Sequence, residues 1–261
     1  MIPKFFGETE RQLFSVYHPA VASAGREGAV VLCHAGPQDY RFTHWAFRKL
    51  AILLAKEGMH VLRFDYYATG DSTGESVDGS LAQWTGDIGA AVQELKDITG
   101  LRRVSLVGMR LGAALAARAS AAGLRVRDLV LWEPVIDGSE YLSQLAEVQT
   151  RWLSELHYPQ DNRRERDELL GYPLVPEMRE AVESIDLIRE GCGAPERLLV
   201  IGPRQRAEDV ALVDKAKIAG VEADIRIVAD AELYRSTQTL PDTLLAHNIP
   251  ATIAAYLARR K

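Results

Sequence analysis

Short apolar runs alternate with amphipathic stretches along most of the chain. Mainly apolar runs of five residues predict buried strands, at 29–33, 60–64, 103–107, 128–132, 197–201 and 224–228. Stretches with helical periodicity follow most of these runs, at 43–58, 80–99, 110–122, 208–218 and 250–260. Because strands alternate with helices, the pattern predicts a mostly parallel sheet with right-handed crossovers. Two further runs, 4–7 and 12–18, flank a polar turn and predict an antiparallel hairpin at a sheet edge.

The boundaries of two segments can also be read from the pattern. Thr43 precedes the apolar periodicity of 43–58 and is the expected N-cap of that helix. Between 139 and 191 the chain has no apolar strand and is rich in Glu, Arg, Gln and Leu. We interpret 139–191 as a helical cap, and 1–138 together with 192–261 as the core that carries it.

Composition and charge narrow the class of protein. The chain has 261 residues and a formal net charge of -5, which argues against a general nucleic-acid binder. No apolar run reaches the ~20 residues that span a bilayer, and the first residues lack the apolar segment of a secretory signal. The two cysteines, Cys33 and Cys192, have no metal-ligand spacing. We therefore expect a cytoplasmic protein with reduced thiols, no metal and no cofactor.

The stretch 104–117 contains the most informative motif. A strand-like run meets Gly108-Met109-Arg110-Leu111-Gly112, and an alanine-rich helical pattern follows directly. Strand, glycine-flanked turn and helix are the context of the nucleophile elbow, G-x-S-x-G, in which the central residue attacks the substrate. Here Arg110 holds the central position. A guanidinium stays protonated and is not a useful nucleophile.

Three segments resemble the α/β-hydrolase fold family: VVLCHAGPQ (30–38), RFDYYATGDSTG (63–74) and GMRLG (108–112). More narrowly, HAGPQDYRFTHWAF, VLRFDYYATGDSTG and KFFGETERQLFSVYHPA resemble bacterial exosortase-associated or serine-aminopeptidase-like hydrolases. The resemblance implies a mostly parallel eight-stranded sheet flanked by helices, with a helical cap.

The same resemblance assigns roles to the turn after the strand 29–33. The family's oxyanion hole maps to the backbone N–H groups of Leu111 and Gly36. His34 corresponds to the family's turn histidine, and Gln38 follows in the same substrate-binding turn. Pro37 has no N–H and cannot donate.

The positions that carry the family's acid and base hold other residues. The segment 202–206 after the strand 197–201 contains no carboxylate, and 228–234 after the last strand contains no histidine. His247 lies well beyond that second segment. Together with Arg110, these differences argue against Ser-His-Asp acyl transfer.

Arg110 and Glu133 are the candidate catalytic residues. At a helix N-terminus, a guanidinium is suited to anchor a carboxylate or phosphate, or to polarise a carbonyl. The alternative is an internal ion pair between Arg110 and Glu133, because Glu133 ends the next strand and a buried Arg requires a partner. Cys33 is either a buried small hydrophobe or a displaced nucleophile.

The polar residues that follow two other predicted strands have simpler structural interpretations. Asp65, Asp71 and Ser72 are expected to fix their loop through side-chain to backbone bonds. Asp137 is either an acid or the N-cap of the cap's first helix.

Three functions are consistent with these features. The first is an enzyme of specialised biosynthesis that acts on an acyl, ester or thioester substrate, free or carrier-bound and including anionic ones, without a covalent nucleophile. The second is a non-catalytic relative that binds an acyl or carboxylate ligand. The third is an interaction protein, such as a homodimer or a dimer partner of an active homologue, with the cap as interface.

Overall fold

The computed structural model describes residues 1–21, 27–155, 168–230 and 248–259. In this part of the chain, eight strands form one sheet in the order β1-β2-β4-β3-β5-β6-β9-β10. They are β1 (Ile2–Glu8), β2 (Arg11–His18), β3 (Gly28–Cys33), β4 (Met59–Phe64), β5 (Val104–Met109), β6 (Asp128–Trp132), β9 (Arg197–Gly202) and β10 (Glu222–Ile227). The hairpin of β1 and β2 pairs antiparallel with β4, and the other neighbours are parallel. The predicted mostly parallel sheet and its edge hairpin are confirmed.

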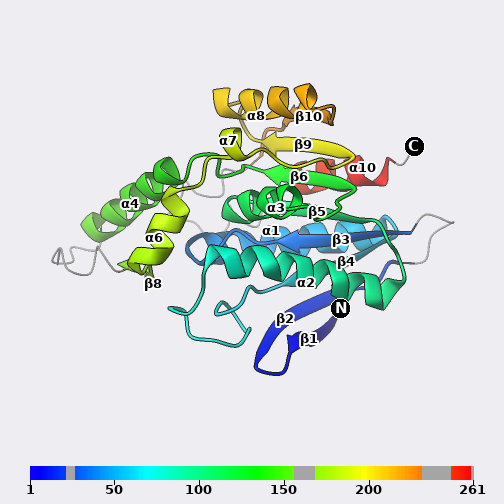
Figure 1. The fold of residues 1–261 in the computed structure, drawn as a ribbon, viewed down its shortest axis with the longest axis horizontal. Helices are drawn as coiled ribbons and strands as arrows, with labels where there is room; N and C mark the ends of the chain where they lie inside the picture. Colours follow the sequence, from blue (N-terminus) through cyan, green and yellow to red (C-terminus); the bar gives the residue numbers. More distant parts are fainter. Residues whose placement is uncertain (22–26, 156–167, 231–247, 260–261) are drawn as a thin grey trace.

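Helices cover both faces of the sheet (Figure 1). They are α1 (Pro37–Lys56), α2 (Leu81–Thr99), α3 (Leu111–Ala121), α4 (Gly138–Glu155), α6 (Pro176–Glu183), α7 (Leu187–Glu190), α8 (Ala207–Ile218) and α10 (Asn248–Ala258). Helices α1 and α10 pack on one face, and α2, α3 and α8 on the other. Successive residues of the central strand β3 point to opposite faces, so Val31 joins one apolar core and Leu32 the other.

The start of α1 corrects one prediction. The helix begins at Pro37, with Gly36 as N-cap at φ 88°, and Thr43 lies inside it with its hydroxyl bonded to the Asp39 carbonyl. The expectation that Thr43 caps the helix was therefore wrong. The first turn is mostly polar, so the apolar periodicity becomes visible only later, whereas Pro at the first helical position was the available signal.

The segment that we interpret as a cap lies beyond the carboxyl ends of the parallel strands, where α4 and α6 extend past the sheet (Figure 1). Asp137 accepts a hydrogen bond from the backbone of Glu140 at 2.8 Å, which confirms its capping role. The cap also contains a short hairpin of β7 (Glu168–Leu169) and β8 (Tyr172–Pro173), so the prediction of a strand-free segment was wrong. Strands of two residues are too short to produce an alternating pattern. Residues 156–167 of the predicted cap lie outside the described residues.

Candidate functional site

A strained turn, residues 108–112, connects β5 to α3. Arg110 has φ 51° and ψ -120°, a conformation that costs free energy in a non-glycine residue. A Cβ on Gly108 would lie 2.4 Å from the Gly112 carbonyl oxygen, and one on Gly112 would lie 2.1 Å from the His34 carbonyl oxygen. Both glycines are therefore required by close backbone contacts. The turn sits at the carboxyl end of β5, where ligands bind in open α/β sheets.

The Arg110 side chain is buried and contacts protein groups from two helices. Its Nε lies 3.6 Å from Oδ2 of Asp39 on α1, and its Nη2 donates to Oε1 of Gln144 on α4 at 3.3 Å. The guanidinium carbon lies 5.2 Å from the ring centroid of Tyr141, and the Tyr141 hydroxyl donates to Asp39 Oδ2 at 3.0 Å. Burial raises the pKa of the Asp39 carboxyl, and the neighbouring guanidinium and hydroxyl partly offset that rise.

Asp39 was missed by the sequence reasoning, which considered Glu133 as the internal partner of Arg110. A helix start at Pro37 would have placed Asp39 in the first turn, facing the same sheet edge. Glu133 directly follows β6 and has φ 44°, and its backbone N–H donates to the Ile201 carbonyl at 2.9 Å. The catalytic roles predicted for Arg110 and Glu133 stay predictions.

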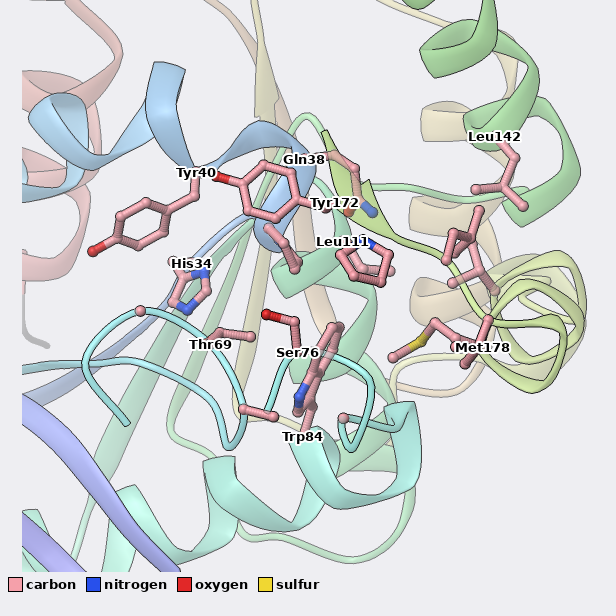
Figure 2. A pocket seen from close by; sticks show the side chains of 18 of the residues that line it. His34, Gln38, Tyr40, Thr69, Ser76, Trp84, Leu111, Leu142, Tyr172 and Met178 are labelled. Carbon is pink, nitrogen blue, oxygen red and sulfur yellow. The ribbon is translucent and has the colours of Figure 1, made fainter. Parts of the chain in front are cut away.

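A cavity of about 410 Å³ lies between the core and the cap (Figure 2). Three of the residues predicted for the site, His34, Gln38 and Leu111, line it. Gly36 adjoins it, because a Cβ on Gly36 would lie 3.1 Å from Cδ2 of Leu111. The structure therefore brings the two predicted oxyanion positions together at the edge of this cavity.

Arg110 lines a separate pocket of about 20 Å³ together with Gln144, Arg206 and Glu208. Tyr141 belongs to the lining of both spaces. Its ring therefore forms part of the partition between the guanidinium and the large cavity.

The described lining of the large cavity is apolar and aromatic with a few neutral polar groups. The rings of Tyr40, Trp84, Tyr141 and Tyr172 contribute to it, as do the polar residues Gln38, Thr69 and Ser76. Among the described residues that line it there is no Asp, Glu, Lys or Arg. Trp84 is held in place by a bond from its Nε1 to the Tyr67 carbonyl at 2.9 Å and by stacking on Tyr66. Trp84 is thus held in place in the cavity wall by the protein itself.

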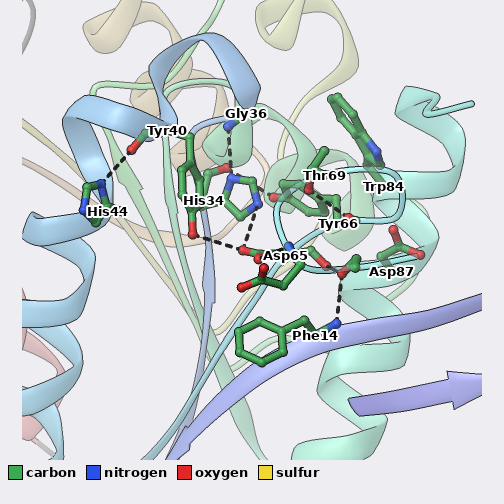
Figure 3. A network of polar contacts seen from close by, with 12 residues as sticks. Phe14, His34, Gly36, Tyr40, His44, Asp65, Tyr66, Thr69, Trp84 and Asp87 are labelled. Atoms are coloured by element: carbon green, nitrogen blue, oxygen red, sulfur yellow. Dashed lines mark hydrogen bonds and ion pairs between the residues drawn. The ribbon is translucent and has the colours of Figure 1, made fainter. Parts of the chain in front are cut away.

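A buried polar network supports one side of the cavity (Figure 3). Asp65 Oδ1 accepts from the Tyr40 hydroxyl at 3.3 Å and lies 4.0 Å from Nε2 of His34. His34 Nδ1 accepts from the Gly36 backbone at 3.3 Å. Burial lowers the pKa of His34 to about 3 and raises that of Asp65. His34 is therefore neutral near pH 7.

Asp65 also fixes the loop that follows β4. Its Oδ2 accepts from the backbone of Asp71 at 3.0 Å, and its carbonyl accepts from the Ser72 hydroxyl at 2.7 Å. A Cβ on Gly70 would lie 2.2 Å from Asp65 Oδ2, so the loop closes tightly over the carboxylate. The prediction that Asp65 and Ser72 fix this loop is confirmed. Thr69 and Gly70 of the same loop line the cavity.

The remaining candidates have structural surroundings. Cys33 is fully buried, and burial raises the pKa of its thiol, so the interpretation as a small hydrophobe is the supported one. After β9, Asp209 accepts a hydrogen bond from Arg206 Nε at 3.0 Å in the first turn of α8. Residues 231–247 after β10, including His247, lie outside the described residues. The described residues contain no group of three or more potential ligands that could hold a metal ion. Across the same residues, no helix is both long enough and apolar enough to span a membrane.

The chain belongs to the α/β-hydrolase fold family, whose model matches residues 28–167. A search of curated proteins found no match. Among solved structures, the chain is similar to Est1E from Butyrivibrio proteoclasticus with bound ferulic acid, at 15% identity and a TM-score of 0.64, covering 97% of both chains.

Two further solved structures are similar to the chain. Esterase Pf2001 from Pyrococcus furiosus has 20% identity and a TM-score of 0.64, with 99% of this chain and 90% of that one covered. Proline iminopeptidase from Mycobacterium smegmatis has 10% identity and a TM-score of 0.65, with 98% and 97% covered. At these identities the likeness establishes the fold, and function has to be argued from the site.

Proposed function

We propose that the chain is an enzyme that binds a small acyl compound, an ester, thioester or related acyl derivative, in the 410 Å³ cavity and converts it without a covalent acyl-enzyme intermediate. The observation that carries the proposal is the convergence of two helix N-termini at the cavity edge. Helix α1 begins directly after Gly36, and α3 begins at Leu111. Backbone N–H groups in the first turn of a helix have no partner within the helix, and the helix dipole there favours negative charge.

Because the Gly36 N–H donates to His34 Nδ1 at 3.3 Å, the donor that we propose for the substrate carbonyl oxygen at this edge is the Leu111 N–H at the start of α3. Preorganised backbone donors of this kind stabilise an oxyanion and contribute several kcal/mol to catalysis in enzymes that use them. The position of the attacking residue is occupied by Arg110, whose guanidinium is engaged with Asp39. The chemistry we propose is therefore attack by water, an elimination or a cyclisation.

The lining favours a neutral substrate with an apolar body. Burying a carboxylate next to apolar groups without a cation is costly, and the described lining residues supply no lysine or arginine. We also propose that the substrates include carrier-bound acyl groups and that the protein acts in specialised biosynthesis. A cytoplasmic location and a narrower relationship to exosortase-associated hydrolases belong to the same proposal. Esterase Pf2001, one of the similar structures, supports the acyl class of substrate.

A second candidate is ligand binding without turnover. The observation that favours it is the same ion pair, because a guanidinium held by Asp39 and Gln144 at the turn is fixed by the protein itself. The two candidates share one binding site and differ only in whether product forms.

The test is turnover of p-nitrophenyl butyrate and of an N-acetylcysteamine butyryl thioester, with products identified by mass spectrometry. Met178→Trp places a large ring in the cavity wall, and Ile218→Trp places the same ring on the surface, where Ile218 is 88% exposed. Wild type and Ile218→Trp should turn over substrate equally, and Met178→Trp should lose at least about tenfold.

Calorimetric binding of cinnamamide and cinnamate, which differ mainly in charge, separates the remaining outcomes. Binding of cinnamamide without turnover of any substrate would favour the second candidate. Neither turnover nor binding, or equal activity in Met178→Trp, would overturn the proposed site. Equal affinity for cinnamate would remove the argument for a neutral substrate.

A further inference from the structure

We propose that Arg110 is a positioning residue that holds the cap helix α4 against the core through Asp39, Tyr141 and Gln144, and thereby sets one wall of the cavity. The proposal concerns the geometry of the cap and does not depend on which reaction occurs.

Three segments far apart in the sequence meet at the guanidinium. Arg110 belongs to the 108–112 turn, Asp39 to the first turn of α1, and Tyr141 with Gln144 to the first half of α4. Tyr141 and Gln144 are three residues apart, so they lie on the same face of α4. Both contact Arg110, through the ring at 5.2 Å and through the amide oxygen at 3.3 Å. A serine at position 110 would be too short to make these contacts.

Asp39 couples the Arg110 guanidinium to the Tyr141 hydroxyl. Its carboxylate is 1% exposed, and the same oxygen, Oδ2, faces the Arg110 guanidinium and the Tyr141 hydroxyl. A buried charge whose partner is removed is strongly destabilising, whereas removing both charges together costs much less. The two charges therefore belong to one unit that also fixes the Tyr141 ring.

The Tyr141 ring connects this unit to the cavity. It lines the 410 Å³ cavity and also the small pocket that contains Arg110. Leu142, the next residue of α4, lines the cavity as well. If the Arg110–Asp39 unit is broken, this part of α4 loses its attachment and the wall loosens. The charged residue at position 110 thus supports the cap.

The test is amide hydrogen exchange of the full chain, followed by peptide in Arg110→Met, Asp39→Asn, Tyr141→Phe and the double variant Arg110→Met/Asp39→Asn. Arg110→Met should speed exchange of α4 amides at least about tenfold, with α2 amides unchanged as internal reference. Tyr141→Phe should have a smaller effect in the same segment. The double variant should exchange faster than wild type in α4, because it lacks the Arg110 contacts, but no faster than Arg110→Met, because no buried charge is left without its partner.

Arg197→Met is the matched control. Arg197 begins β9 and donates to the buried Asp128, which begins β6, at 2.6 Å, at the strand ends opposite to α4. It should leave α4 exchange unchanged. Wild-type exchange of α4 in Arg110→Met, an equal increase in α2 and α4, the same increase in Arg197→Met, or a double variant that exchanges faster than both single variants would each overturn the proposal.

Discussion

Replacing Gly112 by alanine should damage both the stability of the chain and the turn on which the proposed site depends. The added Cβ would lie 2.1 Å from the carbonyl oxygen of His34 and 2.3 Å from that of Cys33. All of these neighbours are backbone atoms, so a change of rotamer cannot relieve the contact. The start of α3 must move away from the end of β3, by roughly 1 Å if a normal contact is to be restored.

The expected cost follows from known effects of overpacking. Inserting a methyl group into a closely packed interior typically costs about 1–3 kcal/mol, and a contact with two backbone oxygens belongs at the upper end of that range. We therefore expect about 3 kcal/mol of lost stability. The same displacement moves the Leu111 N–H away from Gly36, so cavity ligands should also bind more weakly.

Urea unfolding followed by circular dichroism measures this loss, and Gly86→Ala is the matched control. Gly86 lies inside α2, and a Cβ there would meet nothing within 4 Å. Alanine is the better helix former, so Gly86→Ala should stabilise the chain by about 0.5–1 kcal/mol. The midpoint of Gly112→Ala should fall by about 1 M at an unchanged slope. A midpoint equal to that of wild type would refute the argument that backbone contact requires glycine at this position.

Three other predictions concern buried titratable groups. Burial lowers the pKa of His34 in the folded chain to about 3, below the ordinary value of about 6.5. Between these two pH values, His34 binds a proton in the unfolded chain and stays neutral in the folded chain. Stability should fall by up to about 1.4 kcal/mol per pH unit between pH 6.5 and 4.5, and His34→Gln should lack this component in urea titrations; an equal slope in the variant would contradict it. Burial raises the pKa of the Cys33 thiol, and raises that of Cys192 to about 12, so neither should react with a thiol reagent until the chain unfolds; rapid labelling in buffer would contradict that. Asp128 is 2% exposed and accepts a hydrogen bond from Arg197 at 2.6 Å. Asp128→Asn should therefore lower the free energy of unfolding by about 3 kcal/mol, as measured by urea unfolding. A loss below about 1 kcal/mol would contradict the stabilising role of this ion pair.

The fold was largely predictable because its strands are buried on both sides. A central strand such as β3 consists almost entirely of aliphatic residues, and the helices between strands carry an apolar stripe. Local turn chemistry was equally informative at the 108–112 turn. The start of α1 was missed because a polar first turn hides the periodicity.

The site was only partly predictable. The roles of Gly36 and Leu111 were implied by the family resemblance, and their meeting at one edge agrees with the convergence of the carboxyl ends of parallel strands. The partner of Arg110 did not follow, because Asp39 and Tyr141 reach it from segments that are distant in sequence. Two carboxylates, Asp39 and Glu133, were compatible with that edge, and sequence spacing alone does not distinguish them.

The sequence by itself determined the eight strands of the main sheet, the antiparallel hairpin at its edge and the presence of arginine in the 108–112 turn. These properties depend on periodicity and on local backbone preferences, which neighbouring residues specify. Only the tertiary structure decided that the guanidinium pairs with Asp39, that Tyr141 stands between it and a 410 Å³ cavity, and that α4 contributes to the lining of both spaces. The pairing of buried charges depends on distances of a few ångströms between α1, α4 and the turn, and packing of the whole chain sets those distances.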